Sequence, residues 1–129
     1  MDWPTRSFGM LLGLRHDFRD GVAFTEIDFS EDVQNPYRVM HGAVIYSLID
    51  DGMGLSVVRT LEPQQRCATV EISVRYLAAV LQGKVIAETR IVNRAKRIVT
   101  LQSDVRNSEG KLVAIGIGTF YVFDEKAER

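Results

Sequence analysis

Four long stretches in the second half of the chain are rich in β-branched residues and follow one another through short connections. A parallel pair of strands needs a crossover of a dozen or more residues, so strands joined by shorter segments have to run antiparallel. The sequence therefore predicts a four-stranded antiparallel meander. Its strands cover 68–77, 84–93, 97–107 and 112–123, with turns at Gln82-Gly83, at 94–96 and at 108–111.

The first 30 residues predict a short helix and a hairpin. Residues 5–12 follow a proline and end before a glycine, so we expect a short helix there. An Asp20-Gly21 pair then separates the extended runs 14–18 and 22–29. Asp-Gly between two such runs is a strong hairpin signal, so these runs are expected to pair. A loop over 30–40 follows, with a breaking Asn-Pro pair inside it.

Residues 42–59 form the most helical segment of the chain. They are apolar on most sides, which is typical of a helix that the rest of its domain surrounds, and their small residues permit close packing. One helix cannot cover both faces of a large sheet. We therefore expect an α+β fold in which a curved antiparallel sheet wraps around this helix, within a single domain over 1–129. The outer face of the sheet then needs a cover or a partner.

The composition argues against several classes of function. A net charge of −1 gives no basic footprint for nucleic acid. One cysteine and two histidines offer no internal disulfide and no structural metal motif. The start of the chain lacks the pattern of a signal peptide, and the apolar runs are too short to span a bilayer. These observations predict a cytoplasmic protein that binds no metal, no membrane and no nucleic acid.

Asp50 is the first residue that could carry chemistry. It lies in the middle of the apolar helical segment, beside Ile49. A carboxylate on an apolar helix face is costly to bury unless it has a partner, and such acids often serve as a base or a nucleophile. Asp50 could equally lie on the solvent face of the helix. Asp51 is the better candidate for that position, because it points about 100° away around the helix axis.

The pair His41-Gly42 opens the same helical segment. The first N–H groups of a helix have no partner within the helix and carry partial positive charge, so they can hold the oxygen of a carbonyl group as it becomes an oxyanion. A glycine there lets a ligand approach the backbone closely. Taken by itself, the pair is explained at least as well by an ordinary turn into the helix.

The run 35–50 combines Asn35, His41-Gly42 and Asp50 at a characteristic spacing. It resembles the signature of PaaI-type thioesterases, which belong to the superfamily that includes 4-hydroxybenzoyl-CoA thioesterases. That signature has an Asn, five residues, then His-Gly-Gly, and an acidic residue nine positions after the His. Two later runs, 69–77 and 109–120, are similar to the strand after the helix and to the last hairpin of these proteins. The resemblance covers about 33–123.

The resemblance implies a hotdog fold, with a long central helix wrapped by an antiparallel sheet that pairs across a dimer. It implies an acyl-CoA thioesterase that releases a free acid and CoA, with no cofactor beyond the CoA of the substrate. Asp50 would be the general base or nucleophile, and the Gly42 N–H the oxyanion donor. Asn35 and His41 would shape the site, and Thr69 matches a Ser or Thr that assists the water. The chain departs from the family pattern at Arg38, Ala43 and Ala95, where glycine is usual.

Helix geometry adds a constraint of its own. Gly42 and Asp50 are eight residues apart, which is about 12 Å along a helix axis. One thioester carbon cannot lie within ~3 Å of groups at both places, so the two residues either do not cooperate or come from different protomers. An antiparallel pairing of two such helices would bring Gly42 of one beside Asp50 of the other. The sequence thus favours a homo-oligomer, either a dimer or a dimer of dimers.

Other assignments stay open at this stage. Arg94, Lys96 and Arg97 cluster in one turn and are the best candidates to bind the CoA phosphates. Two rival functions remain: a non-catalytic acyl-CoA sensor on the same fold, and a hotdog hydratase or dehydratase. The complete Asn35, His41 and Asp50 set argues against a sensor, and the acid and histidine pattern of the hydratases is not found. The acyl group is not encoded in any recognisable motif.

Overall fold

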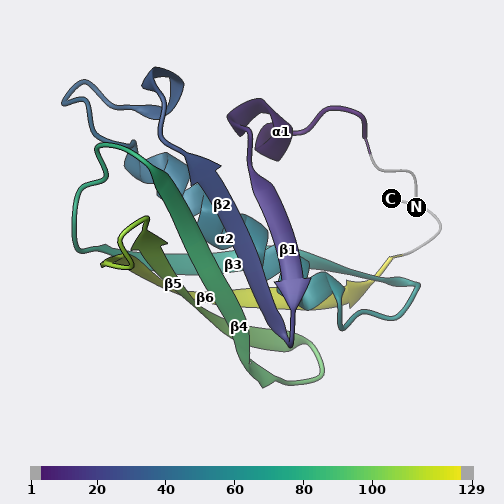
Figure 1. Ribbon diagram of the computed structural model, residues 1–129. Coiled ribbons are helices and arrows are strands. Elements are labelled where there is room, and N and C mark those ends of the chain that lie inside the picture. Colours follow the sequence, from purple (N-terminus) through teal and green to yellow (C-terminus); the bar gives the residue numbers. More distant parts are fainter. Residues whose placement is uncertain (1–3, 126–129) are drawn as a thin grey trace.

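The computed structural model describes residues 4–125, which form one six-stranded antiparallel sheet around one long helix (Figure 1). The predicted α+β hotdog arrangement is confirmed. In chain order the elements are α1 (Phe8–Leu12), β1 (Arg15–Arg19), β2 (Val22–Asp28), a 3-10 turn η1 (Glu31–Val33), α2 (Gly42–Val58), β3 (Gln65–Tyr76), β4 (Lys84–Arg94), β5 (Ile98–Asn107) and β6 (Leu112–Asp124).

The order of the strands corrects one part of the predicted meander. The sheet runs β1-β2-β4-β5-β6-β3, so β3 pairs with β6, and β4 lies between β2 and β5. Only β4, β5 and β6 form a meander. The connection 77–83 does not make a hairpin, because its own backbone groups bind other segments: the N–H groups of Leu77 and Ala78 donate to Val113, and the Val80 carbonyl accepts from Met40. The connection therefore crosses the end of the sheet beside the start of α2.

The N-terminal elements match their sequence signals, with one shift in boundary. Helix α1 begins at Phe8 rather than at residue 5, because the Ser7 side chain accepts from the Met10 N–H and caps the helix there. It ends at Gly13, whose φ of 76° is left-handed, as expected for a C-terminal glycine. Asp20 and Gly21 have φ values of 51° and 79°, which suits the tight turn of the predicted hairpin.

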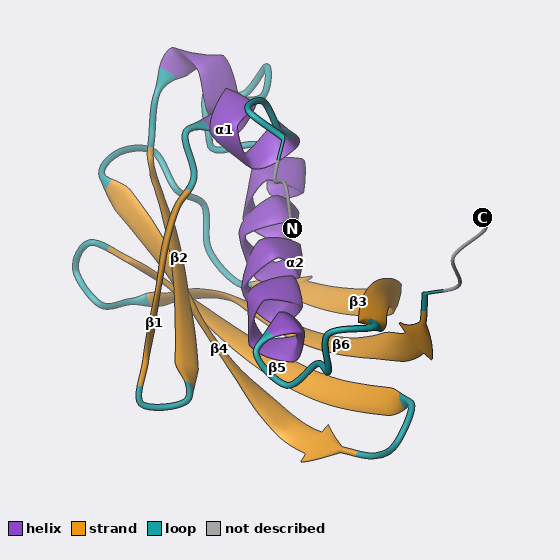
Figure 2. Ribbon diagram, turned by 90° about the vertical axis from the view of Figure 1, so that its right-hand side faces the viewer, coloured by secondary structure: helices purple, strands orange, loops and turns teal. Residues whose placement is uncertain are grey.

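Helix α2 lies against the concave face of the sheet (Figure 2). Small residues allow this close approach, as the sequence suggested. A Cβ added to Gly52 would come within 2.6 Å of the Thr89 hydroxyl, and one added to Gly116 within 2.9 Å of the Ile49 side chain. The helix and the inner sheet face together form the core, in which Leu48, Ile49, Met53 and Val57 are fully buried.

Strand β3 lies at one edge of the sheet and has a single neighbour, β6. It contains 12 residues, and much of it is exposed in the single chain. Long exposed edges are templates for pairing with another strand, so β3 offers a place for a second chain to bind. None of the helices that the structure describes is long and apolar enough to cross a membrane.

Candidate active site

One side of α2 faces the edge strand β3 and brings together three of the residues singled out in the sequence, Gly42, Asp50 and Thr69. Gly42 and Asp50 are eight residues apart on the helix, and each contacts β3 through one hydrogen bond. The partner of Asp50 is Thr69, and the partner of Gly42 is Tyr76. Because β3 is an edge strand, this side of the helix is also the side on which a second chain could approach.

The Asp50 carboxylate is held by Thr69. Its Oδ1 accepts a hydrogen bond of 2.7 Å from the Thr69 hydroxyl, and the residue is half-buried. A carboxylate in this setting keeps lone pairs free for a further donor, because it can accept about four hydrogen bonds. The structure thus joins two residues that the sequence assigned separately, and it leaves the acid able to bind water or a substrate.

Two neighbours of Asp50 are less suited to direct chemistry. Asp51 points toward α1, where a Cβ added to Gly9 would lie 3.4 Å from its carboxylate oxygen. Desolvation raises the pKa of Asp51, and the charge of Asp50 adds to this effect, while His16 opposes it. Burial, followed by the charge of Asp50, raises the pKa of the Cys67 thiol. The thiol therefore stays protonated near neutral pH, in line with a packing role.

The start of α2 has one unoccupied N–H group. His41 caps the helix: its Nδ1 accepts from the Ala43 N–H at 3.0 Å, and its carbonyl accepts from the Val44 N–H at 2.9 Å. The Gly42 N–H donates to no acceptor within residues 4–125. Because Nδ1 is an acceptor, the proton of a neutral His41 ring is on Nε2. The helix start thus presents a free N–H where the macrodipole is positive.

Asn35 shapes the loop before the helix. Its side-chain oxygen accepts from the N–H groups of Tyr37 at 2.9 Å and Val39 at 3.3 Å. The side-chain amide of Asn35 donates to no group in the described part of the chain. Inside this loop Arg38 has a left-handed φ of 67°, a conformation that glycine adopts more readily than any other residue.

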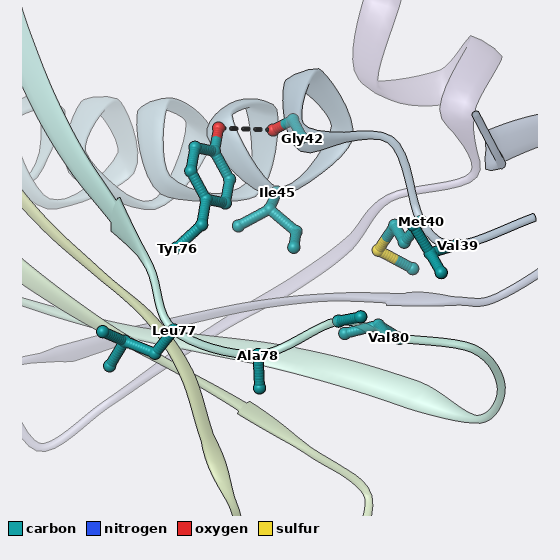
Figure 3. A pocket seen from close by; sticks show the side chains of 9 residues that line it. Val39, Met40, Gly42, Ile45, Tyr76, Leu77, Ala78 and Val80 are labelled. Carbon is teal, nitrogen blue, oxygen red and sulfur yellow. Dashed lines mark hydrogen bonds between the residues drawn. The ribbon is translucent and has the colours of Figure 1, made fainter. Parts of the chain in front are cut away.

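Tyr76 is a site residue that the sequence did not reveal. Its hydroxyl donates a 2.7 Å hydrogen bond to the Gly42 carbonyl (Figure 3), and a Cβ added to Gly42 would lie 3.3 Å from the Tyr76 ring. Desolvation raises the pKa of the Tyr76 phenol, with a smaller contribution from Tyr46, so the phenol remains a donor at neutral pH. Tyr76 lies in the run 69–77 that is similar to the strand after the helix of PaaI-type proteins, but only its position on β3 beside Gly42 reveals its contact with the site.

Two cavities lie on either side of the first turn of α2. The first, of about 410 Å³, extends from Gly42 and Ile45 to the β3–β4 connection (Figure 3). The second, of about 220 Å³, lies between α1, η1 and the helix start, and is bordered by His41 and Ser47. Gly42 lines the first cavity, and its neighbours His41 and Ala43 line the second, so each could hold part of a ligand bound at the helix start.

The three basic residues proposed for CoA phosphates lie at the end of β4 and in the β4–β5 turn, and two of them have partners within the chain. Arg94 donates from Nε to the Thr60 hydroxyl at 3.0 Å and from its terminal nitrogen to the carbonyls of Ala95 and Lys96. Arg97 forms an ion pair with Asp124 at 3.3 Å. Lys96 is exposed. To bind a phosphate, Arg94 and Arg97 would each have to share or exchange a partner.

Residues 37–114 match the family model described as the thioesterase superfamily. The chain belongs to the thioesterase superfamily. It is accordingly a thioester hydrolase, and the predicted resemblance to PaaI-type proteins is confirmed.

Two solved structures and one curated relative are similar to the chain over most of its length. The thioesterase HI1161 of Haemophilus influenzae superposes with a TM-score of 0.92 at 24% identity, over 97% of this chain and 89% of that one. A mutant of the phenylacetic acid degradation protein PaaI of Thermus thermophilus gives a TM-score of 0.80 at 25% identity, over 88% and 96%. A 1,4-dihydroxy-2-naphthoyl-CoA hydrolase of Listeria monocytogenes is 24% identical over 79% of this chain and 83% of its own length.

Proposed function

We propose that this thioesterase hydrolyses acyl-CoA, with Asp50 acting on the thioester and the Gly42 N–H holding its oxygen. The observation that carries the proposal is the arrangement of one side of α2. In the middle of the helix the Asp50 carboxylate is held by Thr69, and at the positive N-terminal end of the helix the Gly42 N–H is unoccupied. Acyl transfer needs this combination, because a base or nucleophile acts on the carbonyl carbon while a donor stabilises the oxyanion.

Two routes are compatible with these groups. In the first, Asp50 takes a proton from water as the water oxygen attacks the carbonyl carbon, and the tetrahedral intermediate then expels the CoA thiolate. In the second, Asp50 itself attacks and forms a mixed anhydride with loss of the thiolate, and water then hydrolyses the anhydride. In both, the products are the free acid and CoA, and the thiolate regains its proton from the acid or from water.

The remaining site residues support the same chemistry. Thr69 orients one oxygen of Asp50, and the other accepts from no group within residues 4–125. The free side-chain amide of Asn35 and the Nε2–H of His41 are donors near the helix start, and we assign them to binding the substrate carbonyl or water. CoA enters only as part of the substrate, and no further cofactor is required by either route.

The proposal requires two protomers. Gly42 and Asp50 of one α2 are about 12 Å apart along the helix, which is too far for one thioester carbon. Both residues face the side of α2 that borders the free edge of β3. Pairing of two β3 edges about a two-fold axis would set two α2 helices antiparallel and bring Gly42 of one protomer beside Asp50 of the other. Each dimer would then contain two equivalent sites.

The test compares two adjacent acids. Wild-type protein, Asp50→Asn and Asp51→Asn are assayed against a panel of acyl-CoAs with a thiol-detecting reagent, after their fold and oligomeric state have been checked. We expect Asp50→Asn to lose activity by at least about a thousandfold, while Asp51→Asn stays close to wild type. Full activity of Asp50→Asn would refute the site assignment. Binding of acyl-CoA by the wild-type protein without thiol release would favour a sensor instead.

A further inference from the structure

We propose that β3 pairs with its own copy in a single register, in which Glu71 of one protomer faces Arg75 of the other and so positions the two halves of the active site. This inference rests on the proposed function, which requires a dimer, and it specifies how that dimer is built. It concerns residues 69–76 of β3, whose outer edge has no neighbouring strand in the single chain.

The pairing of β3 with β6 shows where each site residue lies along the strand. Ser73 lies midway between Thr69 and Tyr76, because the β6 partners of Thr69, Ser73 and Tyr76 are Phe120, Ile117 and Ala114. The composite site needs Thr69 of one β3 beside Tyr76 of the other, since Thr69 holds Asp50 and Tyr76 holds Gly42. A two-fold axis through Ser73 meets this need, because it places Thr69 of each protomer directly opposite Tyr76 of the other.

The β-bulge in β3 makes this register possible. Residues that lie directly opposite each other in an antiparallel pair point to the same face of the sheet. Thr69 and Tyr76 would point to opposite faces of a regular strand, but the bulge after Thr69 brings both to the face beside α2. An axis through Ile72 or Val74 would also match the faces. It would displace Thr69 from Tyr76 by two residues, about 7 Å along the strand.

The same register pairs opposite charges on the outer face of β3. Ile72 and Val74 pack against the core, so alternation places Glu71, Ser73 and Arg75 on the other face. Glu71 and Arg75 lie two pairing positions on either side of Ser73. A two-fold axis through Ser73 therefore sets Glu71 of each protomer opposite Arg75 of the other, and the two pairs flank the axis.

This charge pairing distinguishes the register from its neighbours. Glu71 and Arg75 are exposed, and neither belongs to an ion pair within residues 4–125. Opposite charges that face each other across a strand pair are favourable, and like charges are unfavourable. An axis through Ile72 or Val74 would set both charges against uncharged residues instead. The charges thus favour the same axis as the site residues.

The helix side of the interface agrees with this axis. Tyr46 lies midway between Gly42 and Asp50 on one side of α2, so an axis that brings those two residues together across a dimer sets Tyr46 against its own copy. Tyr46 is 37% exposed in the single chain, and Val70 and Tyr76 on β3 are 60% and 51% exposed. Large apolar side chains exposed on neighbouring elements are typical of a surface that another protein covers.

The first experiment places a single cysteine at the axis. In a Cys67→Ser background, Ser73→Cys is compared with Glu71→Cys and Arg75→Cys, which lie on the same exposed face. Each is oxidised mildly, and the initial rate of covalent dimer formation is followed by denaturing electrophoresis without reductant. We expect Ser73→Cys to react at least about tenfold faster than either control, because directly opposite residues have Cα atoms about 4.5–5.5 Å apart, within the range of a disulfide.

The controls also report a displaced axis. Equal rates at Ser73→Cys and Glu71→Cys would place the axis at Ile72, and equal rates at Ser73→Cys and Arg75→Cys would place it at Val74. Either result would overturn the register. A Ser73→Cys protein that forms no covalent dimer would overturn it too.

The second experiment tests whether the charge pair positions the site. Glu71→Arg sets arginine against arginine, Arg75→Glu sets glutamate against glutamate, and the double variant restores opposite charges in exchanged positions. The dissociation constant of the dimer is measured by light scattering over a dilution series, and thiol release from the acyl-CoA panel is measured at the same dilutions. Glu109→Arg, an equal change of charge in the β5–β6 turn, is the matched control.

We expect each single variant to raise the dissociation constant by at least about tenfold and to lose activity in step with the dimer, because two like-charged pairs then face each other across the interface. The double variant should return to within about threefold of wild type in both measurements. Glu109→Arg should change neither. Single variants that match wild type, or a double variant no better than the single ones, would overturn the proposal.

These outcomes separate the inference from the proposed chemistry. If no acyl-CoA is hydrolysed while Ser73→Cys forms covalent dimers and the charge exchange restores dimerisation, the proposed function fails and the register stands. If wild type hydrolyses acyl-CoA but the exchange does not rescue Glu71→Arg, the register fails while the assignment of Asp50 is unaffected.

Discussion

The Tyr76 hydroxyl on β3 donates a hydrogen bond of 2.7 Å to the carbonyl of Gly42, the first residue of α2. The Tyr76 ring also lies against Gly42, where a side chain would come within 3.3 Å of it. The peptide that carries the free Gly42 N–H is therefore held directly against the edge strand. Tyr76 acts on the proposed oxyanion donor through position alone, since it holds the start of the helix in place.

Replacing Tyr76 with Phe should separate the effect of the hydrogen bond to Gly42 from the effect of the ring packing against Gly42. The ring stays, but the bond to Gly42 is lost, so we expect the free energy of unfolding to drop by about 1 kcal/mol. A looser Gly42 N–H should lower kcat by about tenfold and change KM by less than about twofold, because a displaced donor loses transition-state stabilisation. Steady-state kinetics of Tyr76→Phe measure this split. The control is Tyr121→Phe, on the outer face of the sheet and 43% exposed, which should change neither constant.

Thr69 should contribute to activity through its hydroxyl. Thr69→Val keeps the shape of the side chain but removes the donor to Asp50. Hydrogen bonds to a charged group contribute about 1.5–3 kcal/mol, so kcat should fall by about ten- to a hundredfold. Thr69→Ser restores the hydroxyl and should recover most of the rate. Equal activity of Thr69→Val and wild type would show that this bond has no part in catalysis.

The sequence was sufficient to predict the main elements of the fold and the residue at which the central helix begins. Apolar residues on most sides of 42–59 predicted a central helix, and the short turns predicted the antiparallel order of β4, β5 and β6. The position of β3 was not predictable from turn length, because residues 77–83 are tied to Met40 and Val113 rather than to each other. Such long-range backbone bonds leave no local signal.

A β-bulge explains why the sequence does not predict that Tyr76 and Thr69 lie on the same face of β3. The two residues are seven apart, and strict alternation along a strand would place them on opposite faces. The register of β3 against β6 shifts between Thr69 and Glu71, which adds one residue and brings both side chains to the face beside α2. The bulge residue, Val70, is 60% exposed. Strict alternation would place only one of the two side chains toward α2, so it would predict either the Thr69–Asp50 contact or the Tyr76–Gly42 contact, but not both.

Arg38 should limit stability through its backbone. Its φ of 67° costs an L-residue about 1–2 kcal/mol, and most of all a β-branched one. Arg38→Val should therefore lower the free energy of unfolding by about 1–2 kcal/mol, while Arg38→Gly should equal or exceed wild type. Urea denaturation measures both. Tyr37→Val is the matched control, because Tyr37 is 88% exposed and lies in the same loop. If all three variants unfold alike, the loop does not hold Arg38 in this conformation.

Asp51 should make stability depend on pH in the acidic range. Desolvation, with the charge of Asp50, raises the pKa of Asp51 above its ordinary value of 3.8 in the folded chain. Between 3.8 and the raised value the native state binds more protons than the unfolded chain, so the free energy of unfolding falls as the pH rises through that window. The folded state is thus favoured below 3.8 and penalised above the raised pKa.

Asp51→Asn should abolish this contribution, because the amide has no proton to lose. We expect the variant to be more stable than wild type at pH 7 and to approach wild type as the pH falls toward 3.8, in thermal unfolding followed by circular dichroism at each pH. Ser108→Ala, at an exposed position of the β5–β6 turn that carries no titratable group, is the control and should leave the pH profile unchanged. A wild-type advantage over Asp51→Asn at pH 7 would mean that the Asp51 charge is stabilised in the fold, contrary to the desolvation that raises its pKa.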